Sequence, residues 1–171
     1  QPNMGLANTF GYGNNPVYGI PNIMTADGPA GVRFHPGLGV TTTAFPCATL
    51  LACSWNTDIV YRVGEAGARE VKENGIGIWL TPATNIHRSP LCGRNFEYYS
   101  EDPFAAGAIC TAETKGIQSK GVYVYMKHFA LNDHESGRDG ICVFTNEQAA
   151  REIYLQAFEY PVEDSGAYNV M

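Results

Sequence analysis

Charged residues are scarce in this sequence, and the basic ones are the scarcer kind. Lys and Arg number 11 and Asp and Glu number 17 among 171 residues, so the net charge is -6 at neutral pH. A chain of this charge has no basic patch with which to neutralise a phosphate backbone. We therefore do not expect nucleic acid to be a partner.

Long apolar runs are also missing. Runs such as Ile76 to Leu80 have the length of a strand, whereas a membrane-spanning helix needs about 20 apolar residues. No basic segment followed by an apolar one opens the chain, as it would in a secretory leader. We expect a soluble, cytoplasmic protein that has no membrane partner.

The cysteines form neither a disulfide framework nor a zinc-binding pattern. Their number is odd, and no two of them stand at CxxC spacing. They are Cys47, Cys53, Cys92, Cys110 and Cys142. We interpret them as reduced thiols of a cytoplasmic enzyme, and we expect neither a metal ion nor another cofactor.

Short apolar runs alternate with longer amphipathic stretches, a pattern that is typical of βα units around a parallel sheet. Strands are predicted over residues 22–25, 76–81, 122–127 and 167–171, and helices over residues 57–74, 100–119 and 146–163. Asn56 is placed to cap the first helix and Gly75 to end it. Pro103, preceded by two acids, favours the start of the second.

This pattern predicts the α/β class and a partial TIM-type (β/α)8 barrel of about three βα units plus a fourth strand. A closed barrel needs about 250 residues, and an isolated half-barrel would expose sheet edges. The chain begins without Met and ends at Met171 inside an apolar run. We expect an excerpt of a longer multidomain protein. In it, residues 1–21 would approach and wrap the barrel, and residues 22–171 would form its first part, truncated in the fourth strand.

Polar side chains cluster where the predicted strands end. They are Asp27 and Arg33 after the first strand, Arg94 after the second, and Lys127, His128 and Arg138 at and after the third. The carboxyl ends of barrel strands converge on one face, where active sites lie, so we expect these side chains to meet. A carboxylate accepts hydrogen bonds from neighbouring hydroxyls, and Lys and Arg donate to others. The set predicts a pocket for a polyol.

Some of these residues have a purely structural interpretation too. Asp27 precedes a Gly-Pro pair and suits a turn, and Arg33 and Arg94 could pair with Glu97 or Glu101. A functional role is favoured for Lys127 and His128, because a lysine and a histidine at the end of an apolar strand are costly to bury without a partner.

Other polar and aromatic residues near the strand ends are less informative. His87 and His134 are interpreted as structural or solvated, and a metal site is not expected because no acid or histidine stands at zinc-binding spacing to them. Tyr98 and Tyr99 could stack on a sugar ring or pack beneath the loop that carries them.

Three motifs resemble glycoside hydrolase family 3, the β-glucosidase family, in their order and spacing. They are Ala26-Asp27-Gly28-Pro29-Ala30-Gly31-Val32-Arg33, Gly93-Arg94-Asn95-Phe96-Glu97-Tyr98-Tyr99-Ser100-Glu101-Asp102-Pro103 and Lys127-His128-Phe129-Ala130. The likeness extends from about Gly5 to Met171, and the local sequence is most similar to that of enzymes from gut and rumen anaerobic bacteria. The sequence departs from the family pattern at His134 and in a short, apolar loop over residues 139–144.

The resemblance implies a retaining glycosidase that acts on terminal β-D-glucosyl or related bonds of a β-glucoside or an oligosaccharide. It implies that Asp27, Arg33, Arg94, Lys127, His128 and Arg138 hold sugar hydroxyls and that Glu97 supports one of the cations. The family's aspartate nucleophile and glutamate acid/base have no match here. They would lie in the rest of the enzyme, in the remainder of the barrel and in an α/β domain, so residues 1–171 alone should be inactive.

Two other functions stay open on the residues alone. Lys127 could be the Schiff-base nucleophile of an aldolase-like barrel, if burial lowers its pKa. The chain could also be a sugar-binding fragment without catalytic activity. The choice between glucose and xylose, the aglycone and the oligomeric state, a homo-oligomer included, are not fixed by the sequence.

Overall fold

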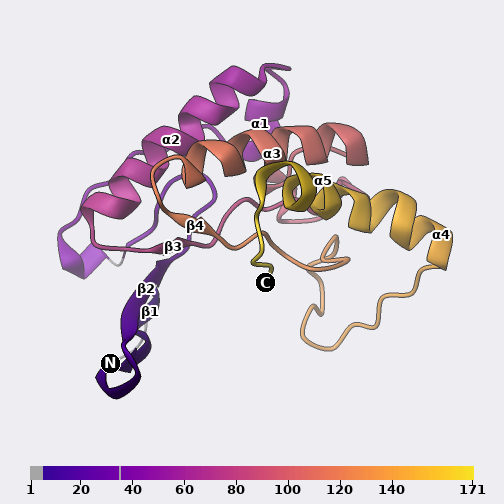
Figure 1. Cartoon of the computed structure of the whole chain (residues 1–171). Coiled ribbons are helices and arrows are strands. Elements are labelled where there is room, and N and C mark those ends of the chain that lie inside the picture. The colour runs from indigo at the N-terminus through magenta and orange to yellow at the C-terminus, as the bar shows by residue number, and fades with distance from the viewer. Residues whose placement is uncertain (1–5, 35) are drawn as a thin grey trace.

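The computed structural model describes residues 6–34 and 36–171, and these form one mixed four-stranded sheet with helices packed against it (Figure 1). The strands are β1 (Leu6–Asn15), β2 (Ile20–Ala26), β3 (Ile78–Trp79) and β4 (Tyr123–Val124), in that order across the sheet. β1 runs antiparallel to β2, whereas β2, β3 and β4 are parallel. A single parallel bridge from Met126 to Val170 continues the sheet beyond β4.

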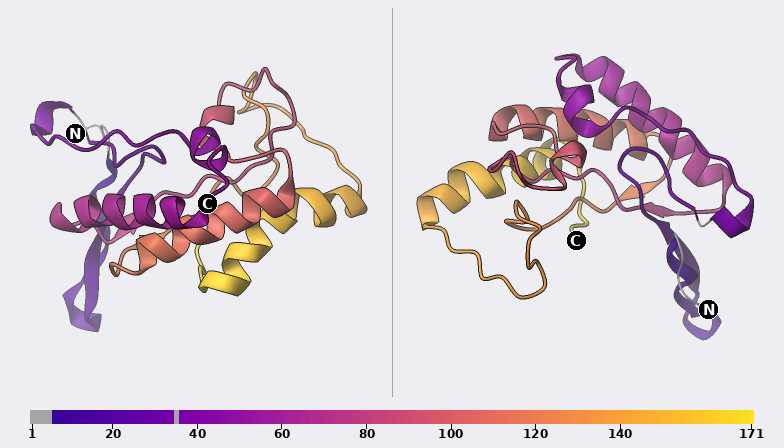
Figure 2. Two further views of the ribbon diagram at one scale, coloured as in Figure 1. Left: turned by 90° about the horizontal axis from the view of Figure 1, so that it is seen from above. Right: turned by 180° about the vertical axis from the view of Figure 1, so that it is seen from behind.

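Helices connect the parallel strands and lie side by side on one face of the sheet (Figures 1 and 2). After β2 come α1 (Ala48–Ala52) and α2 (Thr57–Glu73), and after β3 comes α3 (Pro103–Gln118). After β4 the chain forms one continuous helical stretch: α4 (Glu147–Ala149), the π-helical segment η4 (Ala150–Leu155) and α5 (Gln156–Ser165). Three short 3-10 segments complete the set: η1 (Pro16–Tyr18), η2 (Pro36–Leu38) and η3 (Asn95–Glu97).

The helices begin where side-chain caps satisfy the first free backbone N–H groups. The Asn56 side chain accepts from the backbone N–H of Asp58 at 3.0 Å and of Ile59 at 3.1 Å. Asp102 and Asn146 cap α3 and α4 in the same way, each accepting from the N–H three residues on. The three predicted long helices are therefore confirmed to within a few residues, because their start signals are local.

The strands are shorter than the apolar runs predict. The run over residues 76–81 yields only two residues of β3, and the run over 122–127 yields two residues of β4. The predicted fourth strand, residues 167–171, pairs through the single bridge at Val170. Most apolar residues of these segments are buried, but the ladders are interrupted. Past β3 and β4, an isolated bridge between Ala83 and Lys127 continues the backbone pairing of the two segments.

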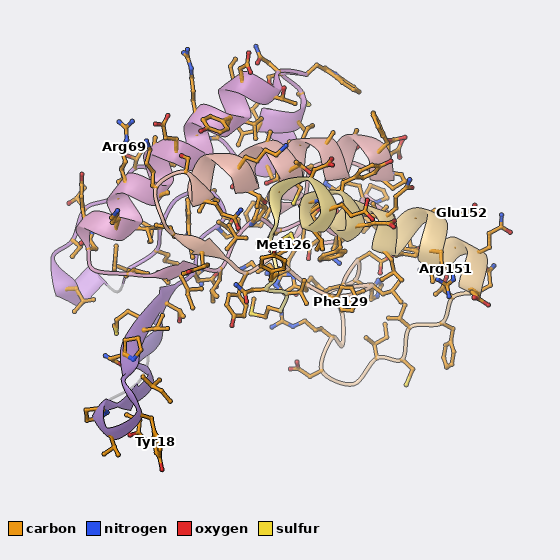
Figure 3. The ribbon with its side chains drawn as sticks, in the orientation of Figure 1. Tyr18, Arg69, Met126, Phe129, Arg151 and Glu152 are labelled. Carbon is orange, nitrogen blue, oxygen red and sulfur yellow. The ribbon has the colours of Figure 1, made fainter. Side chains whose placement is uncertain are left out.

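A β-hairpin at the start of the chain has no counterpart among the predicted elements. The sequence predicts an approach segment over residues 1–21; the structure places β1 and the beginning of β2 in this range, and residues 1–5 lie outside the described part. Gly19, whose φ of 66° is left-handed, closes the turn between the two strands. The hairpin projects away from the helical layer, with Tyr18 at its tip (Figure 3). The helix α1 was also not predicted.

Helix α3 packs closely on α2 because glycines remove the side chains between them. A Cβ atom on Gly116 would lie 2.1 Å from the backbone oxygen of Tyr61, and one on Gly64 would lie 2.5 Å from that of Glu113. The core beneath them contains large buried side chains, notably Trp79, Ile117 and Met126. Within the described part of the chain, no helix is both long and apolar enough to span a bilayer.

This close approach predicts that Gly116→Ala destabilises the domain. The added methyl group must push the two helices apart, which should lower the free energy of unfolding by about 2 kcal/mol despite the better helix propensity of alanine. Lys115→Ala, on the exposed side of the same helix, should change it by less than about 0.5 kcal/mol. Urea denaturation of the three proteins measures both effects, and equal midpoints would contradict the close-packed interface.

Candidate functional site

Asp27 lies directly after β2 and is held by three donors. Its Oδ1 accepts from the backbone N–H of Gly28 at 2.8 Å and from Nζ of Lys127 at 2.5 Å. Its Oδ2 accepts from Nη2 of Arg33 at 2.8 Å. Asp27 and Arg33 also form an isolated antiparallel bridge, so the turn between them fixes the distance between the acid and the cation.

The partner Lys127 is almost completely buried, with 1% of its surface exposed. Its backbone N–H donates to the carbonyl of Pro82 at 3.0 Å, and its carbonyl accepts from the N–H of Thr84 at 2.8 Å. The lysine thus extends from the chain that follows β4, flanked by the chain that follows β3. A buried ammonium needs a close anion, and Asp27 supplies it.

The environment of Asp27 favours its ionised form. Burial alone would raise the pKa of the Asp27 carboxyl, but Lys127, the N–H of Gly28 and Arg33 together hold it below its ordinary value. The carboxylate is therefore available as a hydrogen-bond acceptor throughout the neutral range.

A second cluster surrounds His128, whose backbone is clamped by the side-chain amide of Asn85. The His128 N–H donates to Oδ1 of Asn85 at 2.7 Å, and the His128 carbonyl accepts from its Nδ2 at 2.9 Å. Nη2 of Arg94 lies 2.8 Å from Nε2 of the imidazole. Arg94 also pairs through Nε with the buried Glu97, which orients the guanidinium toward the ring.

These contacts define the charge and the tautomer of His128. Arg94 can only donate, so Nε2 must accept and the ring proton must lie on Nδ1, which faces the hydroxyl of Tyr98 at 3.4 Å. Burial, together with the positive charges of Arg94 and Lys127, lowers the pKa of His128 to about 3. The imidazole is neutral at physiological pH.

Arg138 reaches the same cluster through an acid. Its Nη1 lies 3.3 Å from Oε2 of Glu135, and Oε1 of Glu135 lies 3.8 Å from Nη1 of Arg94. Glu135 therefore lies between two guanidinium groups. With half of its side chain exposed, Arg138 is the more open of the two cations.

All seven residues singled out in the sequence line one open hollow of about 1100 Å³ at the strand ends. The phenyl rings of Phe34 and Phe96 and the side chain of Met171 add apolar surface to its wall. In Figure 3, Met126 and Phe129, which flank the Lys127–His128 pair, lie below the helical layer. The hollow is large enough for a ligand of sugar size, because ligand pockets usually measure about 300–1,000 Å³.

Several supporting residues were not singled out from the sequence. Asn85 and Glu135 make the contacts given above, and Asn132 donates from Nδ2 to the Tyr98 hydroxyl at 3.1 Å. Tyr98 in turn donates to the backbone carbonyl of Asn132 at 3.0 Å. In the sequence, these residues are marked only by their proximity to a motif residue. Their roles depend on contacts with a backbone group or another side chain, which the sequence does not show.

The histidines and tyrosines outside the predicted set have structural positions. Nε2 of His87 lies 2.8 Å from the carbonyl of Asn95 and 2.9 Å from that of Tyr98, and His134 is exposed. Tyr98 and Tyr99 are 0% and 3% exposed, so both pack within the protein instead of presenting a face for stacking. Across the described residues, no group of three or more His, Cys, Asp or Glu side chains could hold a metal ion.

Fold and site together define an α/β domain whose candidate site lies outside the carboxyl ends of parallel strands, where α/β proteins usually bind their ligands. The site offers one carboxylate, several fixed cations and a neutral imidazole, a set of donors and acceptors that suits a ligand with many hydroxyls. The family model described as the glycosyl hydrolase family 3 N-terminal domain matches residues 12–171. The chain therefore belongs to glycosyl hydrolase family 3, as its motifs predict.

Related proteins agree with this assignment. Beta-glucosidase A of Butyrivibrio fibrisolvens is 63% identical over 164 residues, which are 96% of this chain and 20% of that protein. An exo-alpha-(1->6)-L-arabinopyranosidase of Bifidobacterium breve is 41% identical over 162 residues, 90% of this chain and 21% of that protein. The chain spans about one fifth of the length of these curated relatives.

Solved structures agree as well. Beta-glucosidase 3B of Thermotoga neapolitana in complex with alpha-D-glucose superposes with a TM-score of 0.92 at 42% identity, over 100% of this chain and 24% of that one. The beta-glucosidase of Bifidobacterium adolescentis superposes with a TM-score of 0.90 at 39% identity, over 98% and 24%.

The ion pair predicts that Asp27→Asn destabilises the domain, because Lys127 would remain buried without an anion. The free energy of unfolding should fall by about 3 kcal/mol at pH 7. The pKa of Asp27 is lowered in the folded state, so its contribution is present above pH 3.8 and is lost as the pH falls through the folded-state value. The difference between wild type and variant in urea denaturation should therefore be large at pH 7 and shrink below pH 4; a constant difference would contradict the assignment.

The cationic surroundings of His128 predict that its ring stays neutral down to about pH 4. Imidazole resonances in a heteronuclear NMR titration should show His128 as the neutral Nδ1–H tautomer at pH 5. Arg94→Met removes one of the nearby charges and should raise the midpoint of His128. A protonated His128 at pH 6 in the wild-type protein would show that the network has been assigned wrongly.

Proposed function

We propose that this chain is the sugar-binding part of a retaining glycosidase that hydrolyses terminal β-D-glucosyl bonds of β-glucosides or oligosaccharides. The observation that carries the proposal is the pairing of Asp27 with the buried Lys127 beside a neutral His128, in a family whose members with similar sequences include beta-glucosidases. In this proposal Asp27, Arg33, Arg94, Lys127, His128 and Arg138 hold sugar hydroxyls, and Glu97 orients Arg94.

The hydrogen-bonding capacity that remains at the ion pair matches a vicinal diol. A carboxylate has about four acceptor positions and an ammonium has three protons. At Asp27 three positions are occupied, two on Oδ1 and one on Oδ2, and at Lys127 one proton is used. Asp27 can therefore accept from one sugar hydroxyl through Oδ2, while Lys127 donates to neighbouring ones.

The chemical step needs two further carboxyl groups. In a retaining enzyme a nucleophile and an acid/base stand about 5–5.5 Å apart around an oxocarbenium-like transition state. We place both in the rest of the enzyme, because the motif resemblance matches neither to a residue of this chain. The residues of this chain then contribute by orienting the sugar and by forming hydrogen bonds that strengthen as the ring distorts.

The proposed scaffold is a (β/α)8 barrel to which this chain contributes three βα units and the start of a fourth strand. Three successive parallel strands with their helices on one face support it, as do site residues that all follow strand ends. The remainder of the barrel and an α/β domain of the same enzyme would be its partners, and a homo-oligomer is compatible with them. The five cysteines are all free, which favours a cytoplasmic location.

The Schiff-base alternative is disfavoured by the ion pair. An amine must lose its proton before it can attack a carbonyl, whereas Nζ of Lys127 lies 2.5 Å from a carboxylate that favours the ammonium form. Reduction with borohydride in the presence of a carbonyl substrate should leave Lys127 unmodified in a peptide map. The other alternative, a sugar-binding fragment without catalytic activity, predicts that sugar binds without turnover.

Kinetics of the complete enzyme test the proposal. Lys127→Met should lower kcat/KM for an aryl β-glucoside by at least about 100-fold. The substitution removes an ammonium that in this proposal contacts the sugar and that also pairs with Asp27. Arg151→Met is the matched control, since Arg151 is exposed on the far end of the helical layer (Figure 3) and should change kcat/KM by less than twofold. Full activity of Lys127→Met, or no hydrolysis by the wild type, would refute the proposal.

A further inference from the structure

Glu113 is a buried acid outside the candidate site, and it has no cationic partner within the part of the chain that the structure describes. It lies on α3 with 2% of its surface exposed. The ion pairs found among residues 6–34 and 36–171 do not include it. Its carboxyl group instead contacts two hydroxyls: Oε2 accepts from Tyr99 at 2.5 Å, and Oε1 accepts from Thr81 at 3.4 Å.

The two hydroxyls belong to the two segments that carry the site. Tyr99 ends the loop over residues 94–99, which presents Arg94 and Glu97 to the hollow. Its neighbour Tyr98 contacts His128 instead, with the hydroxyl 3.4 Å from Nδ1 of the ring. The loop is therefore held from both sides, by the site through Tyr98 and by α3 through Tyr99.

Thr81 leads to the other half of the site. It immediately precedes Pro82, whose carbonyl accepts from the backbone N–H of Lys127 at 3.0 Å. Two residues further on, the N–H of Thr84 donates to the carbonyl of Lys127 at 2.8 Å. A displacement of Thr81 is therefore transmitted to the backbone that places the Lys127 ammonium against Asp27.

Helix packing leaves Glu113 no room to turn toward solvent. The backbone of α2 at Gly64 lies so close that a Cβ there would meet the carbonyl oxygen of Glu113 at 2.5 Å and its Cγ at 3.3 Å. The titratable groups that face its carboxyl are Tyr99 and Cys110, and burial together with the charge of Glu113 raises the pKa of both. Neither α2 at Gly64 nor α1, whose sequence is ATLLA, brings a charge, and α5 meets α3 at Gly107 through Tyr160.

We propose that Glu113 is a positioning residue for the sugar site, whose carboxyl holds both the loop over residues 94–99 and the end of β3 against α3. The inference rests on the proposed function, since it concerns the same site. In this proposal Glu113, and with it α3, contributes to sugar affinity although Glu113 does not line the hollow.

The burial of Glu113 without a nearby cation favours its neutral form over the anion. Burial raises the pKa of Glu113 to about 7, although hydrogen bonds from Tyr99 and Thr81 act in the opposite direction. Above that pH the group becomes a buried anion without a cation, which is unfavourable and loosens both attached segments. Sugar affinity should therefore fall as the pH rises through about 7. His128 does not titrate in this range, because its pKa is about 3.

The inhibition constant of glucose, measured in the complete enzyme between pH 5.5 and 8.5, tests this inference apart from the chemical step. In the wild type it should increase roughly three- to tenfold over this range. Glu113→Gln keeps the acceptor for Tyr99 but cannot ionise, so its inhibition constant should change by less than twofold. Tyr99→Phe removes a hydrogen bond that favours the anion, so the midpoint should move to higher pH. The exposed Glu73→Gln on α2 should behave as the wild type does.

The outcomes separate this inference from the function on which it rests. A wild-type inhibition constant that does not change with pH would overturn the positioning role, and so would coinciding profiles of wild type and Glu113→Gln. If Glu113→Gln does not fold, the direction of the midpoint shift in Tyr99→Phe decides: an upward shift supports the role and an unchanged midpoint overturns it. Absence of glycoside hydrolysis in the wild type would instead refute the proposed function.

Discussion

The ion pair between Asp27 and Lys127 is the interaction on which the rest of the site depends. It joins residues 100 positions apart, one directly after β2 and one just beyond β4. Lys127 is too deeply buried to remain charged without a partner, so the two strand ends must lie at this separation. The chain after β3 lies between them and bonds to the Lys127 backbone on both sides, which fixes its place as well. Sheet register and site geometry are thus set together.

The second cluster follows from the same positive charge. Lys127 and Arg94 both lie near His128, and with burial they keep the imidazole neutral. A neutral ring can accept from Arg94 through Nε2 and donate from Nδ1, whereas an imidazolium could only donate. Glu97 and Glu135 compensate Arg94 from the other side, so the guanidinium is fixed by two acids and one imidazole. The result is a set of donors and acceptors with little freedom to rearrange.

The residues that were predictable from the sequence are those whose chemistry is unusual for their position. A lysine and a histidine at the end of an apolar run, and an acid before Gly-Pro, stand out because burial or turn geometry alone does not explain them. Helix starts were also predictable, because Asn56, Asp102 and Asn146 cap their helices through local hydrogen bonds. The β-hairpin, α1 and the true strand lengths were not, because pairing depends on partners distant in the chain. Asn85 was missed for the same reason, since its role is visible only once it meets the His128 backbone.

Glu113 is a residue whose burial is not evident from the sequence, because an acid on a helix usually faces solvent. An acid on α3 normally suggests a solvated face, yet this one is buried because Gly64 and Gly116 let α2 approach to backbone contact. Its carboxyl accepts from Tyr99 and Thr81, one on each of the two segments that carry the candidate site. Glycines that serve helix packing therefore also create the environment in which a buried carboxyl lies behind the candidate site. Through Glu113, helix packing and the loops around the hollow share a set of hydrogen bonds.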